Sequence, residues 1–278
     1  MSTISLSLAL LNVRTISDKK LPFINEVTSN DSIHFLCETN IDSNEKRNNI
    51  ESDDYYDYIH IPYNQEFHQR IAIRYLSQNK NVSIDLISHE YITQRRDRKD
   101  QSACQMMHVK IRVSFLHFTA MLIYRCPDSN KATDEKMFTA IKESQPDVIL
   151  GDINLNFFEN STKRIFHEQI DHKQLVKTGT RPEPRRDRGK KSSLIDHFWV
   201  LPKLAHRFRP KVVDISEYEI TDHHLIRVDT DLKIPSPKLT IPREVDKFRR
   251  YQTGHIDWTL FDPNIELKDF KQLNSDQM

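Results

Sequence analysis

Carboxylate and amide side chains recur in this sequence where apolar segments end, which is where strands end and a site can begin. Glu38 follows the apolar segment 33–37, and Asp152 and Asn154 follow the run DVILG. Carboxylate and amide oxygens are hard ligands, which suit Mg²⁺ or Mn²⁺ better than Zn²⁺. We therefore expect a divalent-cation site, with Mg²⁺ as the first choice and Mn²⁺ as the alternative. The polar residues placed in this way are Asn12, Glu38, Tyr124, Arg125, Asp152, Asn154, Asp196, Asp222 and His223.

A histidine and a carboxylate that could orient it indicate which reaction these residues could catalyse. His223 lies in the sequence DHH ahead of the last apolar run, and Asp196 lies within SLID. A His that is oriented by an Asp can stabilise charge on a phosphoryl oxygen, as can a bound divalent cation. No Cys or Ser stands in an obvious nucleophile setting. These residues predict metal-assisted hydrolysis of a phosphodiester.

Considered singly, most of these residues also have a structural explanation. Gly-Asp-x-Asn is favourable turn chemistry, so Asp152 and Asn154 alone would indicate a turn. Glu38 alone is typical of a solvated strand end, and Tyr124 alone of a half-buried core position. His223 is the exception. It lies in the sequence DHH beside an apolar strand, and Asp196 is available as its partner, which together favour a site role.

Composition excludes several classes of protein. The 278 residues carry 41 Lys+Arg against 40 Asp+Glu, which excludes a globally basic or acidic binder. Four Gly exclude glycine-rich phosphate loops, and three Cys without zinc spacing indicate neither a disulfide framework nor a zinc site. No apolar run approaches the roughly 20 residues of a membrane helix, so we expect no membrane partner. Residues 4–11 lack the basic start of a signal peptide, and we expect a nuclear or cytoplasmic protein that is not secreted.

Many short strand-like runs with few helices predict an α+β fold, in which two packed sheets have helices outside. Residues 1–232 would form one domain. Residues 233–278 would be a proline-containing linker and a basic, aromatic appendage. The expected helices are 21–28, 133–144 and 162–172, and the expected strands are 4–13, 33–37, 55–61, 70–76, 82–88, 104–113, 115–124, 147–150, 194–200 and 225–228.

The ordered motifs LNVR, CETN, YRCP, GDIN, SLIDHFWV and TDHHLI resemble those of the exonuclease–endonuclease–phosphatase superfamily. They span about residues 6–230. The resemblance implies the deoxyribonuclease I-like fold, a four-layer α/β/β/α sandwich of two mostly antiparallel sheets. LNVRTI, IYRCPDSN and Thr180-Arg181 are similar to the endonuclease domain of non-LTR retrotransposons. The segment FRRYQTGHIDWTLF resembles the one that joins that domain to a reverse transcriptase, which would be a partner absent from this chain.

The resemblance implies metal and water roles for five matching residues. Glu38 would be the direct metal carboxylate, with Asn12 at the metal shell or the phosphate. Asp222 would lie beside the metal. Asp152 would orient and deprotonate the attacking water, and Asn154 would hold that water.

The resemblance also implies phosphate and DNA contacts. His223 would hydrogen-bond a non-bridging oxygen, with Asp196 fixing its tautomer, and Tyr124 and Thr180 would contact the phosphate. The basic segment 181–191 is either a solvated loop or a hairpin tip at the edge of the cleft that contacts DNA. The arginines expected to bind phosphate or DNA are Arg125, Arg181, Arg185, Arg186 and Arg188.

Three features depart from the superfamily pattern. Thr221 replaces a Ser, and Cys126 stands where Pro is commoner. The segment FHQRIAIRYL (67–76) lacks the glycines expected at the start of a central strand. None of these changes removes a catalytic group.

The leading hypothesis is a Mg²⁺-dependent DNA endonuclease that nicks one strand. The resemblance implies that it leaves a 3′-hydroxyl and a 5′-phosphate. One alternative keeps the fold with another substrate, as an abasic-site nuclease, a 3′ exonuclease or a phosphoesterase. The other is a catalytically dead, domesticated nucleic-acid-binding module. The sequence predicts neither the target sequence nor an oligomeric state.

Overall fold

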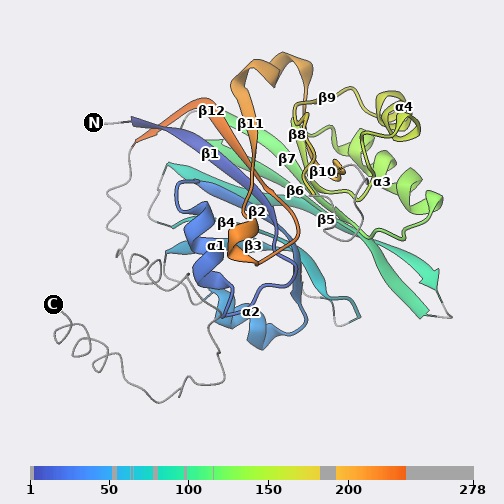
Figure 1. Cartoon of the computed structure of the whole chain (residues 1–278), viewed down its shortest axis with the longest axis horizontal. Coiled ribbons are helices and arrows are strands. Elements are labelled where there is room, and N and C mark those ends of the chain that lie inside the picture. The colour runs from blue at the N-terminus through green and yellow to red at the C-terminus, as the bar shows by residue number, and fades with distance from the viewer. Residues whose placement is uncertain are drawn as a thin grey trace. The chain divides into compact units, whose positions relative to one another are not determined.

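Two six-stranded sheets pack face to face in the computed structural model, with helices outside them (Figure 1). The structure describes residues 3–51, 55–62, 64, 66–77, 81–96, 99–114, 116–181 and 192–235. The first sheet contains, in order, β11 (Phe208–Val213), β12 (Leu225–Pro235), β1 (Thr3–Asn12), β2 (Ile33–Ile41), β4 (Gln69–Leu76) and β3 (Tyr56–His60). The second contains β5 (Val82–Arg96), β6 (Lys99–Val113), β7 (Leu116–Arg125), β8 (Val148–Asp152), β10 (Asp196–Val200) and β9 (Lys173–Gln174).

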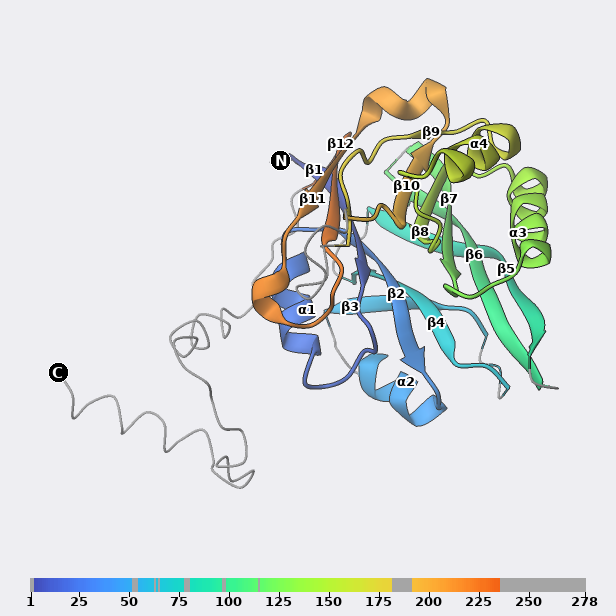
Figure 2. The same ribbon diagram turned by 45° about the vertical axis from the view of Figure 1, so that its right-hand side comes forward.

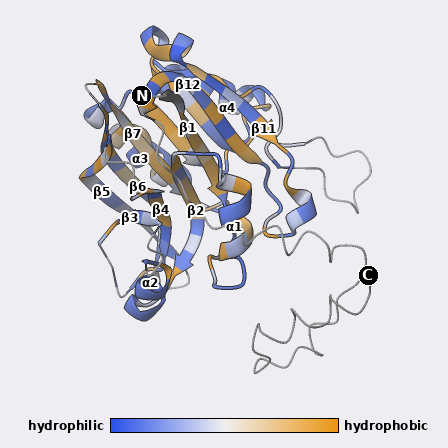
Figure 3. Ribbon diagram, turned by 90° about the vertical axis from the view of Figure 1, so that its left-hand side faces the viewer, coloured by the Kyte–Doolittle hydropathy of each residue, from blue (hydrophilic) through white to orange (hydrophobic). Residues whose placement is uncertain are grey.

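Successive apolar side chains along a strand pack into different layers of the sandwich. Leu8 and Leu10 of β1 join the core between the sheets, whereas Ala9 and Leu11 join an outer cluster under the helices. Successive side chains of a strand point to opposite faces, so one apolar strand can serve two layers. Figure 3 shows the apolar residues concentrated on the strands of both sheets.

Helices cover the outer face of each sheet. On the first sheet these are α1 (Leu21–Thr28) and α2 (Asn44–Glu51). On the second they are α3 (Lys131–Ser144) and α4 (Asn160–Gln169), which Figure 2 shows beside β7, β8 and β10. The predicted four-layer sandwich is confirmed. Two short 3₁₀ segments, η1 (Pro202–Arg207) and η2 (Ser216–Tyr218), lie in the connections that flank β11. Within the described residues, no helix combines the length and apolar character needed to span a bilayer.

Several elements were not expected from the sequence, among them α2, β9 and β11. The segment between the strands expected at 33–37 and 55–61, where no helix was expected, contains α2, in which Ile50 is the buried residue. One apolar residue gives no helical period to detect. The strand β11 was not expected, because Pro210 and its charged neighbours hide the apolar alternation. β12 runs to Pro235, and the rest of the predicted linker and appendage (236–278) lies outside the described residues.

Each sheet contains one parallel pair of strands, and these pairs decide where the polar strand ends lie. β1 and β2 are parallel, as are β7 and β8, while the other pairings among the described strands are antiparallel. Parallel neighbours end at the same edge. Asn12 and Glu38 therefore lie at one end of the first sheet, and Tyr124 pairs with Asp152 at one end of the second.

Gly151 permits the close approach of β8 to β7 that brings Asp152 to this edge. Its φ is +142°, a conformation that L side chains rarely adopt. A Cβ at this position would lie 1.9 Å from the carbonyl oxygen of Ile123 on β7. Glycine is thus required by both conformation and space.

We expect Gly151→Ala to destabilise the fold by about 2–6 kcal/mol, because strain and overcrowding each cost roughly 1–3 kcal/mol. Urea unfolding followed by circular dichroism measures this change. Ser83→Ala, at an exposed position of β5, is the control and should stay within about 0.5 kcal/mol of the wild type. An unchanged unfolding midpoint for Gly151→Ala would contradict the described approach of the two strands.

Candidate active site

A buried hydrogen bond joins the polar end of the first sheet to that of the second. Asn12 Nδ2 donates to Asp152 Oδ2 at 2.8 Å, although the two residues are 140 positions apart in sequence. Asp196 begins β10 and pairs with Asp152 across the antiparallel β8–β10 ladder. The strand ends predicted to share one cleft therefore meet.

A buried cluster of two carboxylates and an imidazole lies at this junction. Potential ligand atoms of Asp152, Asp196 and His223 all lie within 4.8 Å of one another. His223 Nδ1 lies 2.8 Å from Asp196 Oδ2, so Nδ1–H donates to that carboxylate. This bond leaves Nε2 available for a substrate oxygen.

Burial and mutual repulsion set the charge states of the cluster. Burial raises the pKa of Asp152 well above its usual range, and the neighbouring carboxylates of Asp196 and Glu38 raise it further. Burial lowers the pKa of His223, but the carboxylate of Asp196 outweighs this and raises the pKa to about 9. His223 is therefore an imidazolium at neutral pH in the metal-free protein.

The donor set fits a divalent cation. Asp196 Oδ1 is buried and has no hydrogen-bond partner among the described residues. A buried carboxylate oxygen without a donor is costly, and a cation would satisfy it. Ligand atoms of Asp152 and His223 lie within 4.8 Å of a carboxylate oxygen of Asp196, and the carboxylate of Glu38 is close enough to raise the pKa of Asp152. Hard oxygen donors of this kind suit Mg²⁺ or Mn²⁺.

Strained backbone accompanies these side chains. Of the non-glycine residues with positive φ in the described part of the chain, five lie at this edge: Arg14 (44°), Thr15 (83°), Glu38 (54°), Asn40 (52°) and Asn154 (53°). The β2–β4 register breaks between Cys37 and Ile41, so Glu38 and Asn40 lie in a bulge. Left-handed backbone costs free energy and persists only where its surroundings hold it, which makes it typical of functional sites.

Asn154 fixes the orientation of Asp152. Its backbone N–H donates to Asp152 Oδ1 at 3.2 Å, and its Nδ2 donates to the carbonyl oxygen of Arg125 at 2.8 Å. On the neighbouring strand β7, the hydroxyl of Tyr124 donates to Glu38 Oε1 at 3.3 Å. Burial raises the pKa of Tyr124, so this hydroxyl stays protonated as a donor.

Thr180 hydrogen-bonds the backbone on both sides of the site. Its hydroxyl accepts from the N–H groups of Ile195 (3.3 Å) and Asp196 (3.1 Å), and its carbonyl oxygen accepts from the N–H of His224 (2.7 Å). It thereby ties the start of β10 to the loop that carries His223. Thr180 is 0% exposed, so its hydroxyl is not accessible for the predicted contact with phosphate.

Solved structures of other proteins share this architecture. The chain is similar to the endonuclease domain of TRAS1, a telomere-specific non-LTR retrotransposon, at 11% identity and a TM-score of 0.58, covering 82% of this chain and 99% of that one. An endonuclease/exonuclease/phosphatase family protein from Bacteroides thetaiotaomicron is 16% identical with a TM-score of 0.52, covering 84% and 99%. The 3′ phosphatase NExo from Neisseria, solved with a product DNA hairpin, is 15% identical with a TM-score of 0.56, covering 82% and 100%.

The chain has the exonuclease–endonuclease–phosphatase, or deoxyribonuclease I-like, fold. The fold expected from the ordered sequence motifs is thus confirmed. No protein-family model matches the sequence, and no curated protein sequence is similar to it at a significant level. The likeness therefore lies in the fold.

The structure brings together nine of the predicted site residues at one edge of the exonuclease–endonuclease–phosphatase fold. The buried potential metal-ligand cluster is Asp152, Asp196 and His223, whereas the residues predicted to hold the metal were Glu38, Asn12 and Asp222. Asp222 instead accepts a hydrogen bond from Arg181 Nη2 at 2.6 Å. Burial raises the pKa of Asp222, but the positive charges of Arg181 and His223 outweigh this effect and lower the pKa overall. The nine residues are Asn12, Glu38, Tyr124, Asp152, Asn154, Thr180, Asp196, Asp222 and His223.

Arg125 does not have the predicted phosphate-binding geometry. Its side chain is 4% exposed, and it donates to Asp134 (2.5 Å) and to the carbonyl oxygens of Cys126 (3.0 Å) and Ser129 (2.9 Å). These bonds tie the loop after β7 to the start of α3 and leave the guanidinium buried. Arg181 lies at the rim, while the predicted DNA contacts Arg185, Arg186 and Arg188 lie outside the described residues.

Sequence reasoning missed a second rim arginine. Arg14 Nη1 lies 3.8 Å from Asp222 Oδ1, and its side chain is 65% exposed. It belongs to the motif LNVR, which was the available signal. Arg14 and Arg181 together make the rim beside Asp222 basic.

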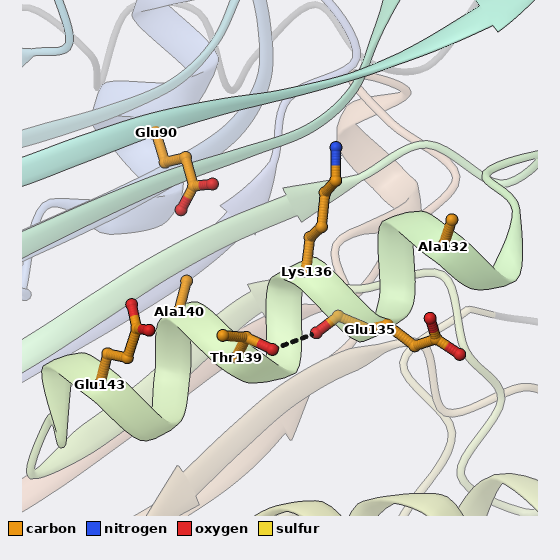
Figure 4. Close-up of a pocket in the computed structure, with 7 residues that line it drawn as sticks. All are labelled: Glu90, Ala132, Glu135, Lys136, Thr139, Ala140 and Glu143. Carbon is orange, nitrogen blue, oxygen red and sulfur yellow. Dashed lines mark hydrogen bonds between the residues drawn. The ribbon is translucent and has the colours of Figure 1, made fainter.

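A separate groove lies between β5 and α3 (Figure 4). It shares no residue with the strand-end site. Its polar side chains are three glutamates, a lysine and a threonine whose hydroxyl donates to the carbonyl oxygen of Glu135 at 2.8 Å. Among the described residues, the glutamates of this groove do not form a metal-ligand cluster such as the one at the strand ends.

The His223–Asp196 pair predicts a pH dependence of stability in EDTA. Because the pKa of His223 is raised to about 9 in the folded chain, its contribution is complete below about 6.5 and is lost as the pH rises through 9. The total change is about 3 kcal/mol, from ~1.4 kcal/mol per unit of pKa difference. Urea unfolding between pH 6 and 9 measures it, and His223→Gln should flatten this part of the profile. The exposed His206→Gln should leave it unchanged, and a wild-type profile for His223→Gln would contradict the assignment.

Proposed function

We propose that this chain is a Mg²⁺-dependent DNA endonuclease that nicks one strand and leaves a 3′-hydroxyl and a 5′-phosphate. The observation that carries the proposal is the buried cluster of Asp152, Asp196 and His223, joined to the first sheet by Asn12. Nuclear or cytoplasmic localisation and cooperation with a reverse transcriptase belong to the same proposal.

The cluster supplies a base for the attacking water. Two donors, Asn12 Nδ2 and the N–H of Asn154, hold the two oxygens of Asp152. Burial raises the pKa of this carboxyl, so its ionised form is a better proton acceptor than a solvated carboxylate. Asp152 can therefore orient a water molecule and take its proton as the oxygen attacks phosphorus.

The opposite side of the cluster supplies a donor for the phosphoryl oxygen. Asp196 holds the imidazole of His223 through Nδ1, and Thr180 in turn holds the backbone of Asp196. His223 Nε2–H can then donate to a non-bridging oxygen as negative charge develops there. A cation bound by the Asp152, Asp196 and Glu38 carboxylates would neutralise further charge on the phosphate.

Basic side chains at the rim favour a polynucleotide substrate. Arg14 and Arg181 flank the cluster, and the sequence continues from Arg181 into the basic segment 182–191. Phosphate contacts of this kind supply affinity that depends on salt. NExo, a structure of similar fold, was solved with a product DNA hairpin, which supports a DNA substrate.

We expect the purified chain to convert supercoiled plasmid to open circles with Mg²⁺ and not with EDTA. Asp152→Asn should lower the nicking rate about 10²–10⁴-fold, the range for loss of a general base. Asp171→Asn, an exposed carboxylate, is the matched control and should nick at the wild-type rate.

Nicking by Asp152→Asn at the wild-type rate would refute the site assignment. If a folded wild-type chain does not nick, abasic-site DNA, RNA and small phosphoesters are the substrates to test. Failure on all of these would leave the nucleic-acid-binding module as the better description.

We expect Glu38→Gln to raise the Mg²⁺ concentration at half-maximal nicking about 10- to 100-fold, because it removes one negative charge beside the cluster. Nicking rates across a Mg²⁺ titration measure this shift. The control Glu168→Gln removes an exposed carboxylate of α4 and should not move the curve. A wild-type curve for Glu38→Gln would show that this carboxylate does not act on the cation.

A further inference from the structure

A cation that the proposed mechanism does not use faces the site from β4. Arg70 is the second residue of this strand, and its neighbours pair with Cys37 and Ile41 of β2. Arg70 therefore lies opposite the bulge that carries Glu38. The break in register opens the ladder at the point where this side chain is placed.

The side chain of Arg70 reaches the same group of residues as Glu38. Its guanidinium carbon lies 5.8 Å from the centroid of the Tyr124 ring, and Tyr124 donates to Glu38. Arg70 Nη1 donates to Asn40 Oδ1 within the bulge. Its backbone N–H donates to Gln105 Oε1 at 2.7 Å, which anchors the start of β4 to β6.

Most of the hydrogen-bonding capacity of Arg70 is unused. A guanidinium has five N–H donors, and in the described part of the chain Asn40 is the one side-chain or backbone group that accepts from it. No carboxylate among the described residues forms an ion pair with it, and the side chain is half-buried. A half-buried cation with free donors is matched by an anion.

The orientation of this guanidinium is held in advance. Asn40 Nδ2 donates to Thr15 Oγ1 at 2.7 Å, and the Asn40 carbonyl oxygen accepts from Lys46 Nζ at 2.7 Å. Asn40 also holds a left-handed backbone conformation, with φ of +52°. Strained backbone fixed by hydrogen bonds from both sides pre-positions its partner, which reduces the ordering cost when a ligand binds.

We propose that Arg70 binds a phosphate group of the substrate beside Tyr124 and positions it for the Asp152 and His223 chemistry. The inference rests on the proposed function and names a residue that the mechanism there does not use. A planar guanidinium matches the oxygens of a phosphodiester or phosphate monoester. Arg70 lies in FHQRIAIRYL, where the resemblance predicts glycines, so this contact is a property of this chain rather than of its fold.

Binding in EDTA separates this role from cleavage. Fluorescence anisotropy with a labelled DNA duplex gives the affinity of wild type, Arg70→Gln and Arg70→Lys across a KCl series. We expect Arg70→Gln to bind about 10- to 100-fold more weakly, the effect of losing a hydrogen bond to a charged group. The slope of log affinity against log salt should fall by about 0.9, and Arg70→Lys should keep it.

Arg112→Gln is the matched control. Arg112 carries the same charge, is 50% exposed, and pairs with Asp85 at the far end of the long strands. Its affinity and slope should equal those of the wild type. If Arg70→Gln does not fold, Arg70→Gly supplies the neutral variant with the residue type that the resemblance predicts.

Thymidine 5′-monophosphate, measured by calorimetry, distinguishes failure of this inference from failure of the proposed function. If the wild type binds the monophosphate but not DNA, the proposed function is wrong, and weaker monophosphate binding by the neutral variant still supports Arg70. Equal affinity of the neutral variant and the wild type for both probes overturns the inference. A lower melting temperature with an unchanged salt slope also overturns it, because that result makes Arg70 structural. A wild type that binds neither probe overturns both proposals.

Discussion

Burial of negative charge at the junction of two sheets is the constraint on which the rest of this structure depends. Asp152 has no exposed surface, and Asp196 and Glu38 lie close enough to raise its pKa. Like charges in such a place repel strongly, because little water screens them. The amide of Asn12 and the imidazolium of His223 offset part of this repulsion, and a divalent cation would offset more. Burial of these carboxylates thus costs stability in the metal-free chain and would favour a bound cation.

No single segment of the chain could meet this constraint. Each sheet contributes the ends of one parallel pair of strands, and the apolar core between the sheets holds those ends in register. The local devices at the edge serve the same purpose. Gly151 lets β8 approach β7, Thr180 ties β10 to the loop of His223, and the bulge of β2 turns Glu38 toward the cluster. The free energy of this strain is supplied by packing elsewhere in the sandwich.

Sequence patterns predicted the layers and most of the residues that the structure brings together at the strand ends, because both follow from local chemistry. Apolar alternation marks strands such as β1, and a polar residue directly after an apolar run marks a strand end, as at Asp152. The missed features depend on three-dimensional context. Arg125 ends a strand, as Asp152 does, yet only its contact with Asp134 on α3 shows that its guanidinium is buried. Arg70 and Asn40 acquire their relation through a break in register and a left-handed backbone, which no local pattern encodes.

The pairing of β1 with β12 sets the order in which the candidate site can be completed during synthesis. The hydroxyl of Thr230 donates to the carbonyl oxygen of Leu6, 224 residues away, so the first strand made is completed by the last described one. Until β12 leaves the ribosome, β1 has one open edge, which is the kind of surface that recruits chaperones or other chains. His223 is translated directly before β12. The nascent chain therefore acquires the imidazole of its candidate site only shortly before it can close its first sheet.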